Sequence, residues 1–218
     1  VEALDGIDAF SPQLIISDVL MPGMTGFEFC QKVKGNIKTS HIPFLLLTGV
    51  TDKKSILEGM RLGAIDYIAK PFDKEVLRSK IANIFELRQA AQRQCLEELK
   101  NNNAVELSNK ADNEFMEKLL KLIETNIDNP ELNIQMMCSE LAMSRTLLYN
   151  KITQLTGKSP TEFIRIFRLK QAGALLLSGE YSVTDVAFKV GIDNPKYFSR
   201  IFKEFYGVSP KEYLAKRE

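Results

Sequence analysis

A stretch of this chain occurs twice, and the repeat limits what the C-terminal part can fold into more than any other feature. Residues 148–164 recur, shifted by 50 positions, at 198–214. In each copy apolar residues recur three or four positions apart, which predicts an amphipathic helix: Leu148, Ile152 and Leu155 in the first, Phe198, Phe202 and Phe205 in the second. A glycine then ends each helix, and a Ser-Pro-x-Glu segment begins the next. Two similar helical units in tandem suit a protein that reads a two-fold or periodic object.

The composition is that of a soluble globular protein of one or two domains, with 218 residues, 44% of them hydrophobic and 26% charged. No apolar run approaches the roughly 18 residues of a membrane span, and nothing resembles a signal peptide. We therefore expect a cytoplasmic segment without membrane contact, in a parent protein that could be membrane-anchored. Three widely separated cysteines and a single histidine exclude a disulfide framework and a Cys/His metal site.

The charge is unevenly distributed between the two ends of the chain. Residues 1–112 carry 14 Lys and Arg against 15 Asp and Glu, whereas residues 144–218 carry 13 against 7. The net charges are therefore −1 and +6, and the basic excess lies with the repeated units. This distribution is expected of a nucleic-acid surface, and the alternative is a basic face that is simply solvated.

The first ninety residues alternate short apolar runs with helical patterns. We expect strands at 13–18, 43–48 and 66–69, and helices at 26–33, 53–62 and 73–87. Such alternation predicts an α/β fold with a parallel sheet and helices on its faces. Residues 89–112 are polar and predict a helical extension followed by a linker. From residue 113 onward every apolar pattern is helical, so the second part should be all-α.

Each predicted strand ends in a polar or reactive residue. The first strand delivers Asp18, the second Thr48, and the third is followed by Lys70 and Pro71. Because the chemistry of an open parallel sheet lies beyond the carboxyl ends of its strands, these side chains should gather at one edge. A carboxylate nucleophile, an ammonium group for phosphate oxygens and a hydroxyl donor can together accept a phosphoryl group.

The motifs around these residues resemble the receiver domain of two-component response regulators. They are Leu-Ile-Ile-Ser-Asp-Val-Leu-Met-Pro-Gly-Met-Thr-Gly at 14–26, Leu-Thr-Gly at 47–49, and Asp-Tyr-Ile-Ala-Lys-Pro-Phe at 66–72. The resemblance implies a flavodoxin-like sheet, with Asp18 as phosphoacceptor, Thr48 as switch hydroxyl and Lys70 before a cis-proline. It also implies that rotation of Tyr67 reports phosphorylation. Gly49 departs from the usual alanine.

A second departure from the receiver pattern lies at the start of the chain. Too few residues precede Asp18 for the first two strands of a receiver, so residues 1–88 are expected to be a partial receiver and a piece of a longer polypeptide. The acidic pair that holds magnesium is absent, and Glu2 and Asp5 precede the strand in what reads as the end of a helix. We therefore expect no metal or cofactor in this chain, and Mg²⁺ only in a complete receiver.

Two helix-turn-helix patterns lie in the remaining chain. The first combines 136–142 with 145–156, capped by Ser144; the second combines 183–190 with a helix that Asn194 caps and Pro195 begins. Joined by a helix at 161–177, they closely resemble the DNA-binding domain of AraC-type transcription regulators. The match spans 113–218 and is specific in Ser144-Arg145, Leu148-Tyr149, Gly157-Lys-Ser-Pro160, Arg168-Leu169, Asp185-Val-Ala-Phe-Lys-Val-Gly191, Tyr197-Phe198-Ser199-Arg200 and Phe202-Lys203, with Ile192 in place of phenylalanine.

The second helix of each unit should turn its apolar row to the core and its polar row to double-stranded DNA. The candidate DNA-binding residues are Arg145, Thr146, Tyr149, Asn150 and Lys151 in the first unit, and Pro195, Lys196, Ser199, Arg200 and Lys203 in the second. Arg200 suits a guanine and Asn150 an adenine, whereas lysines such as Lys151 and Lys203 suit phosphates. Any one of them could instead be a solvated polar residue, and the tyrosines Tyr149 and Tyr197 could pack.

The sequence therefore predicts a transcription regulator at the output end of a phosphorelay, not an enzyme. Its expected partners are DNA, a phosphodonor histidine kinase domain and a second copy of the chain. The kinase would share the polypeptide in a hybrid two-component system, or act on a standalone regulator. The alternative is a phosphohydrolase with Asp18 as nucleophile. Haloacid dehalogenase-type enzymes carry an Asp-x-Asp motif. In this chain Leu20 stands where the second aspartate of that motif would be.

Overall fold

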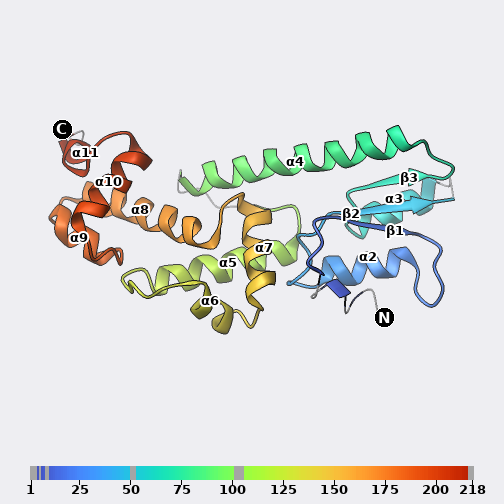
Figure 1. Cartoon of the computed structure of the whole chain (residues 1–218), viewed down its shortest axis with the longest axis horizontal. Helices are drawn as coiled ribbons and strands as arrows, with labels where there is room; N and C mark the ends of the chain where they lie inside the picture. The colour runs from blue at the N-terminus through green and yellow to red at the C-terminus, as the bar shows by residue number, and fades with distance from the viewer. Residues whose placement is uncertain (1–3, 5, 8–9, 50–52, 101–105, 216–218) are drawn as a thin grey trace. The chain divides into compact units, whose positions relative to one another are not determined.

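The computed structural model describes the chain apart from residues 1–3, 5, 8–9, 50–52, 101–105 and 216–218 (Figure 1). The chain divides into two compact units, Val1–Glu117 with Met143–Gly157, and Lys118–Ala142 with Lys158–Glu218. The elements are β1 (Ile15–Asp18), α2 (Gly26–Gly35), β2 (Phe44–Thr48), α3 (Lys53–Arg61), β3 (Asp66–Ala69), α4 (Lys74–Lys100), α5 (Lys110–Thr125), α6 (Ile134–Glu140), α7 (Arg145–Thr156), α8 (Pro160–Ser178), α9 (Val183–Lys189), α10 (Pro195–Tyr206) and α11 (Pro210–Ala215). The predicted order of an α/β part and an all-α part is confirmed.

The described strands form one parallel sheet in the order β1-β2-β3. Ile15 pairs with Phe44, Asp18 pairs with Leu47, and Thr48 at the end of β2 pairs with Ala69. The three strands therefore end at nearly the same level, which brings the residues that follow them to one edge of the sheet.

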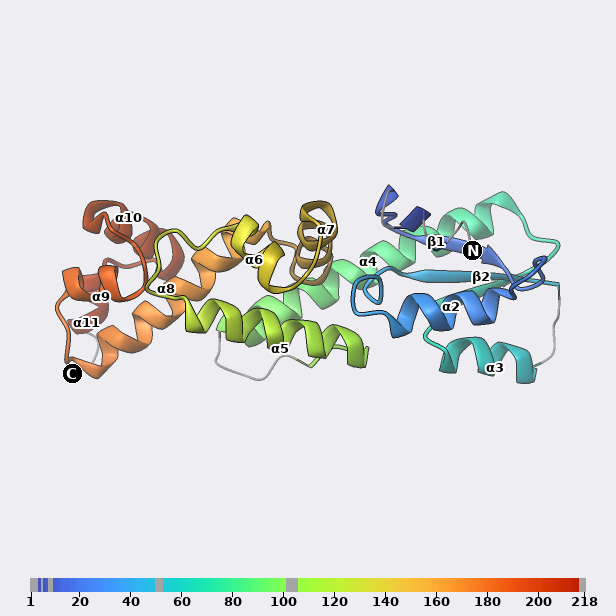
Figure 2. The same cartoon turned by 90° about the horizontal axis from the view of Figure 1, so that it is seen from below.

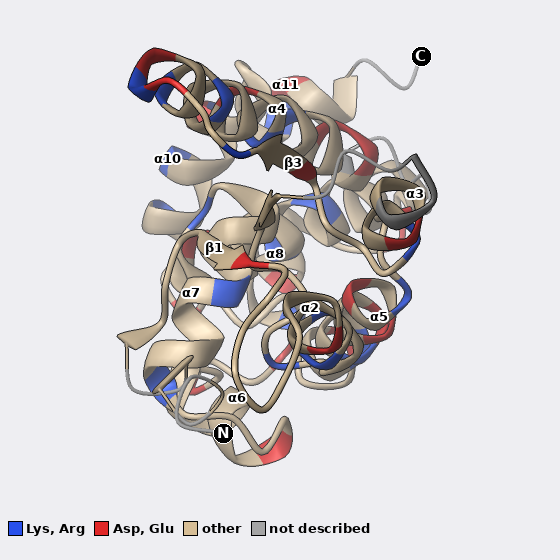
Figure 3. Cartoon of the chain, turned by 90° about the vertical axis from the view of Figure 1, so that its right-hand side faces the viewer, with Lys and Arg blue, Asp and Glu red and all other residues tan. Residues whose placement is uncertain are grey.

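Helices cover both faces of this sheet. Successive side chains of β2 point in opposite directions, so Phe44 and Leu45 meet different helices. Phe44 meets Phe29 of α2 edge to face, with ring centroids 5.3 Å apart. On the other face Leu45 packs with Ile84 of α4. Figures 2 and 3 show the strands between α4 on one side and α2 on the other, with α3 beside α2.

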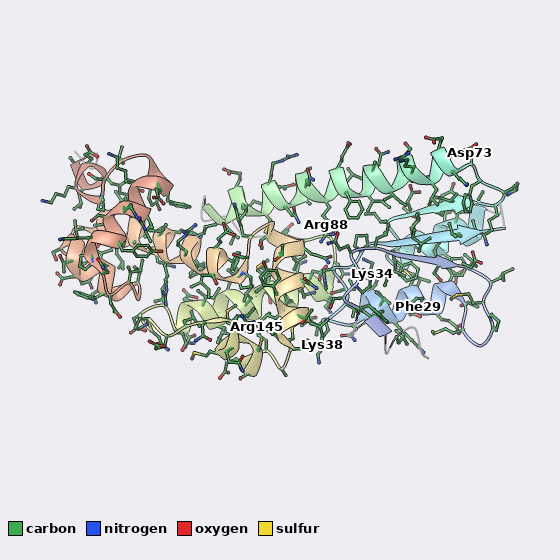
Figure 4. The ribbon with its side chains drawn as sticks, viewed as in Figure 1. Phe29, Lys34, Lys38, Asp73, Arg88 and Arg145 are labelled. Carbon is green, nitrogen blue, oxygen red and sulfur yellow. The ribbon has the colours of Figure 1, made fainter. Side chains whose placement is uncertain are left out.

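Side-chain hydrogen bonds form at both ends of α2. Thr25 and Glu28 form a capping box at its start, in which each side chain accepts a hydrogen bond from the other residue's backbone N–H. Near its end Lys34 donates from Nζ to the carbonyl oxygens of Ser40 and Ile42, at 2.9 and 2.7 Å (Figure 4). The segment that leads into β2 is thereby tied to the helix.

The helical extension predicted after Arg88 is continuous with the preceding helix, so α4 runs for 27 residues. Good helix formers such as Glu, Gln, Ala and Arg fill this extension, and the buried side chains of Cys95 and Leu99 anchor it. Gln92 donates from Nε2 to the carbonyl oxygens of Thr153 and Gln154, at 3.1 and 2.9 Å, and so caps the end of α7.

The second compact unit, Lys118–Ala142 with Lys158–Glu218, is built around α8, whose apolar side packs on α9 and α10. Its core includes Leu169, Leu176, Val186, Phe198 and Phe202. Both Ser-Pro starts predicted from the repeat are helix starts, and the glycines before them, Gly157 and Gly207, have φ of 69° and 77°, the left-handed conformation that glycine adopts without strain. No helix in the described part of the chain is long and apolar enough to cross a membrane.

Arg168 ties three segments of the second unit together. Arg168 is buried, and its guanidinium donates from Nη1 to the carbonyl of Gly191 at 3.0 Å and from Nη2 to that of Asn129 at 2.5 Å. The two backbone carbonyls stabilise the buried cation by accepting its hydrogen bonds.

Candidate functional site

The predicted acid, hydroxyl and amine meet at the carboxyl edge of the sheet. Lys70 Nζ lies 2.5 Å from Asp18 Oδ1, and the two side chains are 42% and 41% exposed. Thr48, at the end of the strand between them, is 5% exposed, and its carbonyl accepts a hydrogen bond from the Lys70 backbone N–H at 2.7 Å. The Lys70–Pro71 peptide bond is cis, as the resemblance implied. The site therefore combines a reachable carboxylate with a paired ammonium group.

Tyr67 lies on β3, three residues before Lys70. It lines a small cavity of about 10 Å³ whose walls also include Thr48, Val19 and Phe27. Lys80 lies over the Tyr67 ring, 5.8 Å from its centroid, and pairs with Asp66 at 2.6 Å. Thr48 and Tyr67 thus border the same space, so the position of one affects the room left for the other.

The carboxylate of Asp18 lies at the carboxyl edge of the described sheet, beside Lys70, and Mg²⁺ would need several further oxygen ligands there. Among the described residues no three His, Cys, Asp or Glu side chains are grouped so that they could hold a metal ion. Glu2 and Asp5 lie outside the described residues.

Helix α7 has one buried side and one exposed side, as its sequence predicts. Ser144 caps it by accepting a hydrogen bond from the backbone N–H of Leu147. Leu147, Leu148 and Ile152 are buried, whereas Tyr149 is 45% exposed. Arg145 and Thr146 are also exposed on this side, and Asn150 is partly exposed there (Arg145 is labelled in Figure 4). Four of the five candidate DNA-binding residues of this unit therefore share one accessible side, and Tyr149 is not a packing residue.

The prediction that Lys151 contacts DNA is wrong. Its side chain is fully buried, and Nζ donates to Asp112 Oδ1 at 2.5 Å and to Ser40 Oγ at 3.0 Å. Lys151 comes four residues after Leu147 and three after Leu148, which places it on the buried side of a helix. Burial lowers the pKa of Lys151, and the charge of Asp112 opposes that effect.

Helix α10 repeats the arrangement of α7 without a buried charge. Asn194 Oδ1 accepts hydrogen bonds from the backbone N–H groups of Lys196 and Tyr197, and Pro195 occupies the first helical position. Phe198 and Phe202 are fully buried. Lys196, Arg200 and Lys203 are exposed on the other side, where Figure 3 shows basic residues along α10.

Two details of α10 refine the expected roles. The Arg200 guanidinium lies over the Tyr197 ring, 5.4 Å from its centroid, and Tyr197 is 40% exposed. This contact places Tyr197 on the surface beside Arg200, not in the core. Ser199 donates from Oγ to the carbonyl of Pro195 at 2.9 Å, so its hydroxyl proton is used within the helix.

Asp112 is the residue at this site that the sequence reasoning missed. An aspartate at the third position of a helix reads as a solvated residue near the positive end of the helix dipole. The signal lay in the repeat: the position that carries Lys151 in the first unit carries Ile201 in the second, and a core position that holds a lysine needs a buried acid.

Two protein families match the chain. Residues 1–82 match the response regulator receiver domain, and residues 137–216 match a helix-turn-helix domain. Histidine kinase P4 of Formosa agariphila is 38% identical over 203 residues, which are 93% of this chain and 15% of that protein. Response regulator PleD of Caulobacter vibrioides is 35% identical over 88 residues, which are 38% of this chain and 19% of that protein. The chain thus spans less than a fifth of either relative.

Solved structures match each half separately. The C-terminal domain of AraT, a response regulator from Geobacillus stearothermophilus, is 30% identical, with a TM-score of 0.44 over 46% of this chain and 83% of that one. A putative response regulator from Chloroflexus aurantiacus is 38% identical, with a TM-score of 0.37 over 38% of this chain and 68% of that one.

Proposed function

We propose how the residues of this chain divide the tasks of a DNA-binding regulator. The chain belongs to the two-component response regulators that join a receiver domain to an AraC-type helix-turn-helix domain. The exposed sides of α7 and α10 read double-stranded DNA, and phosphorylation of Asp18 controls that binding. Within its parent protein the chain acts in the cytoplasm, where DNA and a phosphodonor kinase domain are both present.

The observation that carries the DNA-binding proposal is the shared design of the two helices. Each is 12 residues long, has a side-chain cap at its start and glycine at its end, and exposes polar side chains opposite a buried row. A major groove admits one such helix, and Arg or Asn side chains can form paired hydrogen bonds with a base edge there. We assign the base contacts to Arg200 and Asn150, and phosphate contacts to Lys196 and Lys203, whose side chains are exposed.

The ion pair at the sheet edge supports the phosphoacceptor role. In the proposed step a carboxylate oxygen of Asp18 attacks the phosphorus of a phosphohistidine, the P–N bond breaks, and the imidazole keeps the electron pair and takes a proton from water. Lys70, 2.5 Å from the carboxylate in the unmodified state, then pairs with phosphoryl oxygens. The Thr48 hydroxyl, at the same edge, donates to one of them.

The phosphohydrolase alternative uses the same carboxylate but requires turnover. Such an enzyme needs a second acid or base to activate water, and the position two residues after Asp18 holds Leu20, which is 75% exposed and has no proton to give. We therefore propose a phosphoacceptor that is not an enzyme. Sustained release of phosphate from a small phosphate ester by the chain would favour the alternative.

A second copy of the chain and a kinase domain are the further proposed partners. In the described sheet β1 pairs with β2 alone, and Ile16 and Leu20 on or beside it are 41% and 75% exposed. An apolar strand with an open edge favours pairing with another strand, so we propose that this segment self-associates when it is purified by itself. Sedimentation that shows a stable monomer would contradict this. The likeness to Histidine kinase P4 supports a kinase in the same polypeptide.

The decisive experiment selects double-stranded DNA from a random pool with the purified chain. Selection of a defined sequence supports the proposal, and retention that disappears with moderate salt for every sequence contradicts it. In the full-length protein, treatment with a phosphodonor should change affinity for the selected DNA, and Asp18→Asn should abolish that change while leaving basal binding intact.

A further inference from the structure

A buried ion pair lies directly beneath the first of the two DNA-reading helices. Lys151 on α7 is 0% exposed and Asp112 at the start of α5 is 8% exposed, with 2.5 Å between Nζ and Oδ1. The Lys151 ammonium also lies 4.8 Å from the centre of the Phe115 ring. The hydroxyl of Ser40 donates to the same Asp112 oxygen at 2.6 Å. Lys151 Nζ, Ser40 Oγ and Asp112 Oδ1 thus form one buried hydrogen-bonded network.

A pair of this kind is not needed to hold such a unit together. Charges lose their hydration on burial, and a well-packed apolar pair of similar size is often as stabilising as a buried ion pair. The protein supplies its own example, because the position of Lys151 is taken in the second unit by Ile201, which is 3% exposed.

Near the start of a helix an acidic side chain can also bond within its own helix, as Glu162 does in α8. Glu162 turns back to the start of its own helix, where it accepts a hydrogen bond from the Ser159 hydroxyl at 2.8 Å. Asp112 instead reaches across to α7. The first unit therefore uses a directional contact where the second uses apolar packing.

We propose that Asp112 and Lys151 are positioning residues, which set the rotation of α7 about its axis and so determine which base edges its exposed row can reach. Lys151 follows Asn150 and Tyr149 directly in the helix, so a rotation at Lys151 displaces both of them. An apolar contact tolerates a small rotation, whereas a charge-assisted hydrogen bond is strong only within narrow limits of distance and angle. The inference rests on the proposed reading of DNA by α7.

The test replaces the ion pair by an apolar pair. The double variant Lys151→Ile with Asp112→Leu puts an apolar residue at 151, as Ile201 is at the matching position of the second copy, and leaves no unpaired charge, so it should unfold cooperatively near the wild-type temperature. Its discrimination between the selected DNA and DNA with changed base pairs should fall about tenfold at positions read by α7, and remain unchanged at positions read by α10. Exposed Lys203→Met serves as the matched lysine control.

The dependence of affinity on salt separates positioning from a phosphate contact. Lys203→Met should reduce the logarithmic salt slope by about one, whereas the double variant should keep the wild-type slope. Wild-type discrimination in the double variant, or a reduced slope in it, would overturn the inference. If the double variant does not fold, Asp112→Glu decides, because it keeps the charge but lengthens the arm; unchanged discrimination at the α7 positions would then refute positioning. If the wild-type chain discriminates no DNA, the proposed function fails instead.

Discussion

Asp18 and Lys70 lie 2.5 Å apart at the end of two strands that are not neighbours, with β2 between them. The pair is open to solvent, so a phosphodonor can reach the carboxylate while the ammonium group remains beside it. Exposed ion pairs contribute little to stability, at most about 1 kcal/mol. The small contribution of this pair to stability is therefore compatible with a chemical role for both side chains.

Lys70→Ala should separate these two contributions. We expect the free energy of unfolding to change by less than about 1 kcal/mol, because the pair is two-fifths exposed. The change in DNA affinity on phosphodonor treatment of the full-length protein should be lost. Chemical denaturation and a DNA titration measure the two quantities, and a variant that still responds to the phosphodonor would remove Lys70 from the proposed step.

Arg200→Ala and Lys203→Ala should weaken DNA binding in different ways. Loss of the Arg200 guanidinium should remove discrimination at one base pair, by roughly 1 to 3 kcal/mol. Loss of Lys203 should weaken binding to all sequences and flatten the salt dependence. Titration against selected and mismatched DNA at several salt concentrations distinguishes them; an equal loss for every sequence with Arg200→Ala would show that this residue makes no base contact.

Arg168→Met should destabilise the second unit by about 2 to 4 kcal/mol, because the carbonyls of Gly191 and Asn129 lose a charged donor. Arg165→Met, on the exposed side of the same helix, is the matched control and should change stability by less than about 0.5 kcal/mol. Thermal unfolding of both variants measures the difference. Similar values for the two would mean that the backbone contacts of Arg168 contribute nothing net.

His41, the single histidine of the chain, should make stability depend on pH below neutrality. Burial, with Lys151, Arg88 and Lys34 nearby, lowers the pKa of His41 from 6.5 to about 2. The folded state therefore keeps the ring neutral while the unfolded state protonates below pH 6.5, so stability falls as pH drops through 6.5. Between pH 7 and pH 5 the loss should reach up to about 2 kcal/mol. His41→Gln should remove this slope, and an unchanged slope would place its origin elsewhere.

The sequence predicted those features whose signals are local. Asp18, Thr48 and Lys70 each follow an apolar run, so their meeting at one edge follows from parallel pairing alone. Asn194 and Pro195 carry the side-chain oxygen and the fixed φ that a helix start needs.

What the sequence reasoning missed depends on distant partners. Lys151 was assigned to the surface because a lysine is almost always solvated, and only the position of Asp112 in space makes its burial tolerable. The sequence also does not indicate the role of Arg168, because its hydrogen-bond acceptors are backbone carbonyls, which every residue has. Caps and strand ends are local choices, whereas the compensation of a buried charge is a property of the assembled core.

The fixed ends of α7 and α10 limit how much of a target site each can cover. Twelve residues rise about 18 Å, and base pairs are stacked about 3.4 Å apart, so one helix passes along no more than about five steps of the duplex. Since each helix stops at a left-handed glycine, neither can lengthen this span by adding a turn. The recognised sequence should therefore consist of two short blocks, one for each helix, with an intervening stretch of base pairs that are free to vary.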